Sequence, residues 1–214
     1  DFAPEDLSLH YHRSLYSSLQ SLVRSNFDRL KKMLPKLPEH VRAEAEEVLK
    51  LRSEIMESFK QIFAHKINTL KIRTHGDYHL GQVLFTGKDF VILDFEGEPA
   101  RSYSERRLKR SPLRDVAGMI RSFHYAAYNA LLQDENQQTE HAEELQQWSE
   151  KWYQYISGFY IKSYLGVVGN APIIPDNKRD FDVLIHTFLL EKAVYEMGYE
   201  LNNRPNWVLI PIRG

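Results

Sequence analysis

The sequence contains no cysteine, and this absence excludes several kinds of protein at once. A disulfide framework, a thiol nucleophile and a thiolate metal site all require cysteine. No apolar run approaches the roughly 18 to 20 residues of a membrane span, and no signal-peptide pattern opens the chain. We therefore expect a cytoplasmic protein with no membrane partner.

A strong net charge is also missing, since 28 Lys and Arg residues oppose 29 Asp and Glu residues. This balance gives no electrostatic reason to bind nucleic acid or an anionic membrane surface. The 214 residues, of which 43% are hydrophobic, suit one globular domain with a real core or two small lobes. We expect no nucleic-acid partner.

Helical periodicity dominates the chain on both sides of a short β-like region. It predicts helices over residues 4–34, 39–66, 113–133, 139–166 and 178–202. Short strands are predicted at 72–74, 83–86 and 90–95, with a turn at 86–89 and a hairpin buried under helices. The tail after residue 202, which contains two prolines, is expected to be extended. The predicted fold class is α+β, mainly α.

Three polar features outside the hairpin have structural interpretations. Residues 100–111, ARSYSERRLKRS, carry five basic side chains, which indicates a solvated loop or a segment that approaches phosphates. Asp115 is expected to cap or orient the helix that begins there. Glu200 and Arg204 are four residues apart and are expected to pair.

The stretch RTHGDYHLGQVLFTGKDFVILDFEGEP, residues 73–99, gathers acids, amides and histidines around two short strands. His75 and His79 have the spacing of a His-Glu-x-x-His metalloprotease motif. Gly76 occupies the position of the Glu, and Gly81 interrupts the required helix, so we disfavour that interpretation. Aspartates that cap turns are the plainer alternative.

The spacing fits phosphoryl transfer in kinase-type folds. Such sites need an Asp to accept the attacking hydroxyl, an amide five residues later and a second Asp across a hairpin, as Asp77, Gln82 and Asp94 are placed. A hairpin returns the chain, so these three side chains are predicted to converge around one Mg²⁺. This ion prefers hard oxygen ligands and keeps several waters.

Neighbouring residues are assigned supporting roles. Phe95 is expected to anchor Asp94 in the core, and Glu96 could add a carboxylate near the metal. His75 is expected to hold the loop through a backbone hydrogen bond. His79 could orient Asp77 or contact phosphate, and the sequence does not choose between the two.

Residues 73–99, followed by SERRLKRSPLRDVAGMIRSFHYAA and later LEKAVYEMGYELNNRPNW, resemble maltokinase. These bacterial enzymes of the aminoglycoside-phosphotransferase-like group, with a protein-kinase-like fold, are often fused to the C-terminus of trehalose synthase. The resemblance spans the chain and is most specific between residues 73 and 127. It implies conversion of maltose and ATP, with Mg²⁺, to maltose 1-phosphate on the way to α-glucan. It also implies trehalose synthase as a fused or associated partner.

By motif, the resemblance implies that Asp77 is the catalytic base and that Gln82 and Asp94 bind magnesium. It places the disaccharide against Glu191, Lys192, Tyr195 and Tyr199; some relatives have Asp at the position of Glu191. Residues 191, 195 and 199 share one face of a helix, where a carboxylate and two tyrosines can bind sugar hydroxyls. Half-buried packing of the tyrosines is the structural alternative.

A nucleotide-binding segment is not evident. The sequence has no Gly-x-Gly-x-x-Gly, no P-loop and no strand-borne Lys before His75, and it begins at Asp1 without Met. We therefore expect residues 1–214 to be the C-terminal lobe of a kinase-like enzyme, inactive without its N-terminal nucleotide lobe. Within it, residues 1–70 are a helical segment, 71–99 the catalytic loop and hairpin, and 100–214 the helical substrate-binding part.

Two alternatives stay open at this stage. The same constellation serves kinases for other hydroxyl substrates, such as an aminoglycoside, choline or another sugar. A non-catalytic kinase-like module that binds glucan or a partner enzyme is the second alternative.

Overall fold

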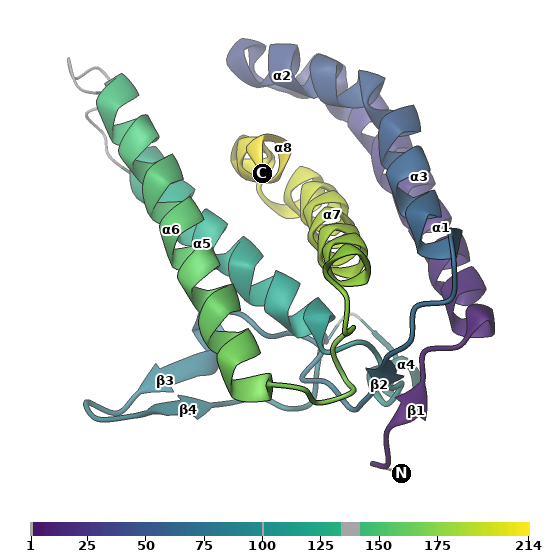
Figure 1. Ribbon diagram of the computed structural model, residues 1–214. Coiled ribbons are helices and arrows are strands. Elements are labelled where there is room, and N and C mark those ends of the chain that lie inside the picture. The colour runs from purple at the N-terminus through teal and green to yellow at the C-terminus, as the bar shows by residue number, and fades with distance from the viewer. Residues whose placement is uncertain (1, 100, 134–141) are drawn as a thin grey trace.

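The computed structural model describes residues 2–99, 101–133 and 142–214 and shows a mainly helical α+β lobe, as predicted (Figure 1). The helices are α1 (Leu9–Met33), α2 (Glu39–Lys50), α3 (Arg52–Lys60), α4 (Tyr103–Arg106), α5 (Leu113–Gln133), α6 (Ala142–Val168), α7 (Lys178–Asn203) and α8 (Leu209–Arg213). Short 3₁₀ turns cover Leu34–Lys36, Gln61–Phe63, Leu80–Gln82 and Pro205–Trp207. No helix in these ranges combines the length and hydropathy of a membrane span.

Helix α7 is the centre of the lobe. It packs against α5 on one side and α1 on the other, and α6 covers the outer side of α5 (Figure 1). Fully buried apolar side chains from α1, α5 and α7, such as Leu19, Leu113 and Leu184, form one continuous core. This core fixes the start of α5 and the middle of α7, which carry much of the site described below.

Two small antiparallel sheets complete the fold. Strand β1 (Glu5–Asp6) pairs with β2 (Leu70–Lys71), and β3 (Val83–Phe85) pairs with β4 (Phe90–Ile92). The predicted hairpin is therefore confirmed, although its second strand ends at residue 92. The predicted strand at 72–74 is wrong, because only Ile72 makes a bridge there, to Arg110.

The first two predicted helices are corrected at their ends. Helix α1 begins at Leu9 because the Ser8 side chain accepts a hydrogen bond from the Tyr11 amide, while residues 5–6 pair with β2. The helix predicted over 39–66 divides where the Leu51 amide bonds to the carbonyl of Val48, a 3₁₀-type closure that neither Gly nor Pro signals. The first residues of the helix predicted over 139–166 lie outside the described ranges.

The hairpin is not buried, which corrects the sequence prediction. Phe85 is 60% exposed and Phe90 66% exposed, and the other side chains of β4 are exposed as well. The apolar sequence of residues 90–95 predicts a strand that is buried on both faces, but the helices of the described lobe do not cover it. Phe95, at 64% exposure, does not anchor Asp94 in a core, although its ring lies 5.2 Å from that of His75.

The tail is helical, not extended as predicted. Residues 208–211 are buried, and α8 packs against α2 and α7. Pro211 lies in the first turn of α8, where its missing N–H costs no helical hydrogen bond. Burial of the apolar sequence VLIPI therefore outweighs the proline signal.

A buried histidine in α5 gives the fold a testable pH dependence. His124 is 2% exposed, and burial, with Arg121 nearby, lowers its pKa to about 3. The unfolded chain binds a proton at this site near pH 6.5 and the folded chain does not, so stability falls as pH falls below 6.5. At pH 5 this histidine alone is expected to cost about 2 kcal/mol of the free energy of unfolding.

Urea denaturation at pH 7.5 and pH 5.0 measures this cost. His124→Phe keeps an aromatic ring against Tyr128 and Tyr153, whose ring centroids lie 4.4 and 5.0 Å away, and should lose less stability on acidification than the parent. His10→Gln, a change of an exposed histidine, is the matched control and should behave like the parent. Equal pH responses of the parent and His124→Phe would contradict the assignment.

Candidate active site

His75 ties the loop between β2 and β3 to the hairpin. His75 is buried, and its Nε2 lies 2.7 Å from the carbonyl oxygen of Leu93, at the end of the hairpin. Its Nδ1 accepts a hydrogen bond from the Asp77 amide at 3.3 Å, so the proton resides on Nε2. The predicted backbone hydrogen bond is confirmed, and it ties the loop to the hairpin.

Asp115, in the first turn of α5, binds the same loop. Its two carboxylate oxygens accept hydrogen bonds from the amides of His75 at 2.7 Å and Gly76 at 2.9 Å. Burial raises the pKa of Asp115 above its ordinary value. The sequence interpretation of Asp115 as a helix cap missed this contact, because the partner amides lie about 40 residues away in sequence.

A glycine lets α5 approach the loop closely. A Cβ atom at Gly118 would lie 2.7 Å from the carbonyl oxygen of Tyr78, so any larger residue would push the loop away. Ser122, one turn further along α5, accepts a hydrogen bond from the Leu80 amide. The first half of α5 is therefore the platform on which the loop rests.

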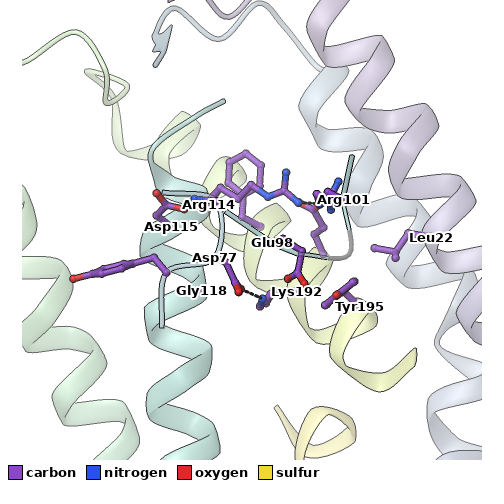
Figure 2. A pocket seen from close by; sticks show the side chains of 13 residues that line it. Leu22, Asp77, Glu98, Arg101, Arg114, Asp115, Gly118, Lys192 and Tyr195 are labelled. Atoms are coloured by element: carbon purple, nitrogen blue, oxygen red, sulfur yellow. Dashed lines mark hydrogen bonds and ion pairs between the residues drawn. The ribbon is translucent and has the colours of Figure 1, made fainter. Parts of the chain in front are cut away.

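Asp77 lies between the loop and α7. Its side chain is 17% exposed, with Oδ1 3.7 Å from Lys192 Nζ and Oδ2 3.8 Å from His79 Nε2 (Figure 2 shows Asp77 and Lys192). The Nδ1 of His79 accepts from the Gly81 amide, so Nε2 carries the proton and is on the side of Asp77. The structure thus brings together three predicted site residues, Asp77, His79 and Lys192.

Gln82 and Asp94 meet across the base of the hairpin. The Gln82 amide Nε2 donates to Asp94 Oδ2 at 3.1 Å, and the Leu93 amide donates to the Gln82 carbonyl. Asp94 has a φ of 58°, the only positive value at a non-glycine residue in the described ranges. Such strain is held by surrounding contacts and is frequent at functional sites.

The two glutamates after Asp94 differ in position. Glu96 is exposed and does not line the cavities around Asp77, whereas Glu98 lines both. Glu98 also lies close to the Tyr195 hydroxyl, and burial together with this carboxylate raises the pKa of Tyr195 to about 12. Glu98 is the site residue that sequence reasoning missed; its only signal was the acidic cluster EGEP.

A cleft of about 380 Å³ extends from Asp77 along α7. Its wall includes the predicted residues Lys192, Tyr195 and Tyr199, and Figure 2 shows Lys192 and Tyr195 with Asp77 and Glu98 around a neighbouring cavity. Lys192 Nζ lies 5.3 Å from the Tyr195 ring centroid. Tyr199, with 49% exposure, stands at the outer end of the cleft.

Two of the four acids that line the cleft are paired with arginines. Arg121 donates to Glu196, and Arg204 donates twice to Glu200, which confirms the predicted 200–204 pair. Burial raises the pKa of Glu196. The charges of these two glutamates are therefore balanced, whereas Asp77 and Glu98 line the same cleft without an arginine partner.

Glu191 is the remaining predicted site residue, and it lies in the cavity next to the cleft. Its Oε1 accepts from Arg114 at 2.7 Å, while its Oε2 is buried without a hydrogen-bond partner in the described part of the chain. A buried carboxylate oxygen in this state is a ready acceptor for a ligand hydroxyl.

The basic segment 101–110 is fixed by internal contacts. Lys109 pairs with Glu5, and Arg106 donates to the carbonyls of Pro99 and Arg101. Ser102 and Glu105 form a capping box at α4. These contacts support the structural interpretation for two of its five basic side chains, Arg106 and Lys109.

The residues present fit a magnesium ion. Gln82 and Asp94 supply an amide and a carboxylate oxygen side by side, and Mg²⁺ typically takes only one or two carboxylates from protein and completes its shell with phosphates and water. Groups of three or more His, Cys, Asp and Glu side chains suited to a metal are absent from the described ranges. An ion at Gln82 and Asp94 would therefore take most of its ligands from outside the described side chains.

Comparison with known proteins gives sugar kinases. No protein-family model matches the chain. It is similar to a glucosamine kinase of Mycolicibacterium smegmatis (strain ATCC 700084 / mc(2)155), with 37% identity over 82 residues, 38% of this chain and 20% of that protein. A glucosamine kinase of Streptacidiphilus jiangxiensis is 23% identical over 140 residues, 65% of this chain and 30% of that protein.

Solved structures extend the likeness to the whole lobe. A glucosamine kinase in complex with glucosamine, ADP and inorganic phosphate superposes with a TM-score of 0.72 at 19% identity, over 100% of this chain and 48% of that one. A second crystal form gives 0.72 at 20% identity, over 92% and 45%. The chain thus has the fold of part of a sugar kinase and spans less than half the length of these relatives.

Proposed function

We propose that this chain is the acceptor-binding and metal-binding lobe of an ATP-dependent sugar kinase, with maltose as its acceptor. The observation that carries the proposal is the position of Asp77 at the inner end of the cleft, on a loop tied to the Gln82–Asp94 pair through His75. This is the arrangement that phosphoryl transfer to a hydroxyl requires.

In this proposal Asp77 accepts the proton of the attacking sugar hydroxyl. Lys192 and His79, at 3.7 and 3.8 Å from its two oxygens, orient the carboxylate toward the cleft. Gln82 and Asp94 would hold Mg²⁺, which supplies charge neutralisation for the transferring phosphoryl group when bound. Asp115 and His75 keep the loop in register.

The cleft offers groups that suit a neutral sugar. Two of its carboxylates, Glu196 and Glu200, are compensated by arginines. Tyr195 and Tyr199 offer ring faces and hydroxyls in the cleft, and Glu191 offers its unpartnered Oε2 in the neighbouring cavity. These are the groups that a disaccharide with many hydroxyls can use, in line with the resemblance to maltokinase.

Glucosamine is the second candidate acceptor, because the similar proteins found by comparison are glucosamine kinases. Glu98 is the carboxylate in the cleft best placed to receive an amino group, since its partner is the neutral Tyr195 hydroxyl. The rest of the site chemistry is shared by the two acceptors.

A substrate panel separates the candidates. We expect full-length protein with ATP and Mg²⁺ to phosphorylate maltose with a kcat/KM at least tenfold above that for glucosamine or glucose, detected as phosphosugar by mass spectrometry. The 214-residue chain, assayed beside it, should show little turnover, because the nucleotide must be positioned by a further lobe. A preference for glucosamine would replace maltose as the proposed acceptor. If none of the acceptors yielded a phosphosugar, the kinase proposal itself would be contradicted.

A further inference from the structure

The outer face of α6 carries a row of five exposed apolar side chains, four of them aromatic. Leu145, Trp148, Trp152, Tyr155 and Phe159 recur at alternating steps of three and four residues, the spacing of a helix–helix seam. Their exposed fractions are 41, 62, 47, 76 and 60%. We name these five residues the α6 stripe.

The stripe is not needed to pack the lobe. Helix α6 already uses its other face, where Tyr153 and Tyr160 make ring contacts with His124 and Phe123 of α5. Helix α5 lies between α6 and α7 (Figure 1), and none of the five stripe residues lines the cleft. Exposed rings of this size in one row are uncommon on a monomeric protein and indicate a binding face.

We propose that the α6 stripe is a dimer interface in which two copies of this chain pack α6 against α6 in antiparallel orientation. Trp152 is the middle residue of the stripe. A two-fold axis at Trp152 therefore places the N-terminal half of the stripe in one copy against the C-terminal half of the stripe in the other. A self-complementary patch of this kind is what a two-fold interface requires.

Charge at the two ends of α6 supports the antiparallel register. Glu144 lies eight residues before Trp152, and Lys162 lies ten residues after it, both exposed. With the two-fold axis at Trp152, Glu144 of one copy and Lys162 of the other differ in height along the helix axis by two residues, which is about 3 Å. Side chains of this length can bridge that offset. A parallel pair would instead set like charges together.

The available area fits a weak but specific dimer. An aromatic side chain presents about 150–250 Å², so at the exposed fractions above the four rings contribute roughly 500 Å² per copy, or about 1,000 Å² in total. This lies at the lower edge of stable interfaces before flanking residues are counted. We therefore expect a dissociation constant in the micromolar range. This inference is independent of the proposed function.

Sedimentation equilibrium between 1 and 100 μM tests the interface. The parent chain should pass from monomer to dimer over this range. Trp152→Glu should remain monomeric throughout, because its dimer dissociation constant should be at least 100-fold higher. Phe2→Glu changes a residue that is 78% exposed outside the stripe and should dimerise like the parent. A monomeric parent at 100 μM, or a Trp152→Glu protein that still dimerises, would overturn the proposal.

The register is tested by charge reversal. Lys162→Glu should weaken the dimer three- to tenfold, and the double variant Glu144→Lys/Lys162→Glu should return to within twofold of the parent. Failure of the double variant to recover would overturn the antiparallel arrangement. A parent that stays monomeric while maltooligosaccharides quench its tryptophan fluorescence would assign the stripe to carbohydrate binding instead.

Discussion

Replacement of Asp77 by Asn is expected to lower the kcat of sugar phosphorylation in the full-length protein by about 10²- to 10⁴-fold, the usual contribution of a general base. Asn keeps the size of the side chain but cannot take the hydroxyl proton. Its contacts with Lys192 and His79 span 3.7 and 3.8 Å, so their loss should disturb the fold little.

The measurement is steady-state kinetics with saturating acceptor, together with circular dichroism and thermal unfolding. Asp182→Asn, on the exposed side of α7, removes a carboxylate that pairs with Lys178 and does not line the cleft, and it is the matched control. It should leave kcat unchanged. An Asp77→Asn enzyme with parental kcat would exclude Asp77 as the base, whatever the acceptor sugar.

Several contacts of the candidate site could be predicted from local sequence because the residues that make them are close along the chain. The hairpin pairs Val83 with Ile92, and this pairing alone brings Gln82 beside Asp94. The bond from His75 to Leu93 depends on the same turn. Residue spacing and turn chemistry are therefore enough to predict these contacts without knowledge of the tertiary structure.

Features that depend on distant segments were not predictable in the same way. Asp115 meets the loop only because α5 packs beneath it, and Glu98 faces the cleft only because α7 supplies Tyr195. The burial of the hairpin was predicted wrongly, since apolar content shows that a strand can be covered but not what covers it. The tail was predicted wrongly because packing outweighed a local proline preference.

The contact between Asp115 and the loop that carries Asp77 leads to the second large effect. In Asp115→Asn one carboxylate oxygen becomes an NH₂ group, which cannot accept from the amide of His75 or Gly76. One buried hydrogen bond is then lost and two donors face each other, at a cost of about 1–3 kcal/mol. The loop must shift to relieve this contact, and it carries Asp77 with it.

A displacement of about 1 Å at a catalytic group can lower the rate by about 100-fold, and we expect a fall in kcat of that order for Asp115→Asn. Hydrogen exchange should accelerate at the amides of His75 and Gly76 while amides in the cores of α5 and α7 keep their protection, a pattern that a general loss of stability would not give. Ser122→Ala removes the single bond to the Leu80 amide and should lower kcat less than tenfold. If Asp115→Asn kept kcat within threefold while both amides lost protection, Asp77 would not depend on this anchor, because the loop would hold its position through His75 alone.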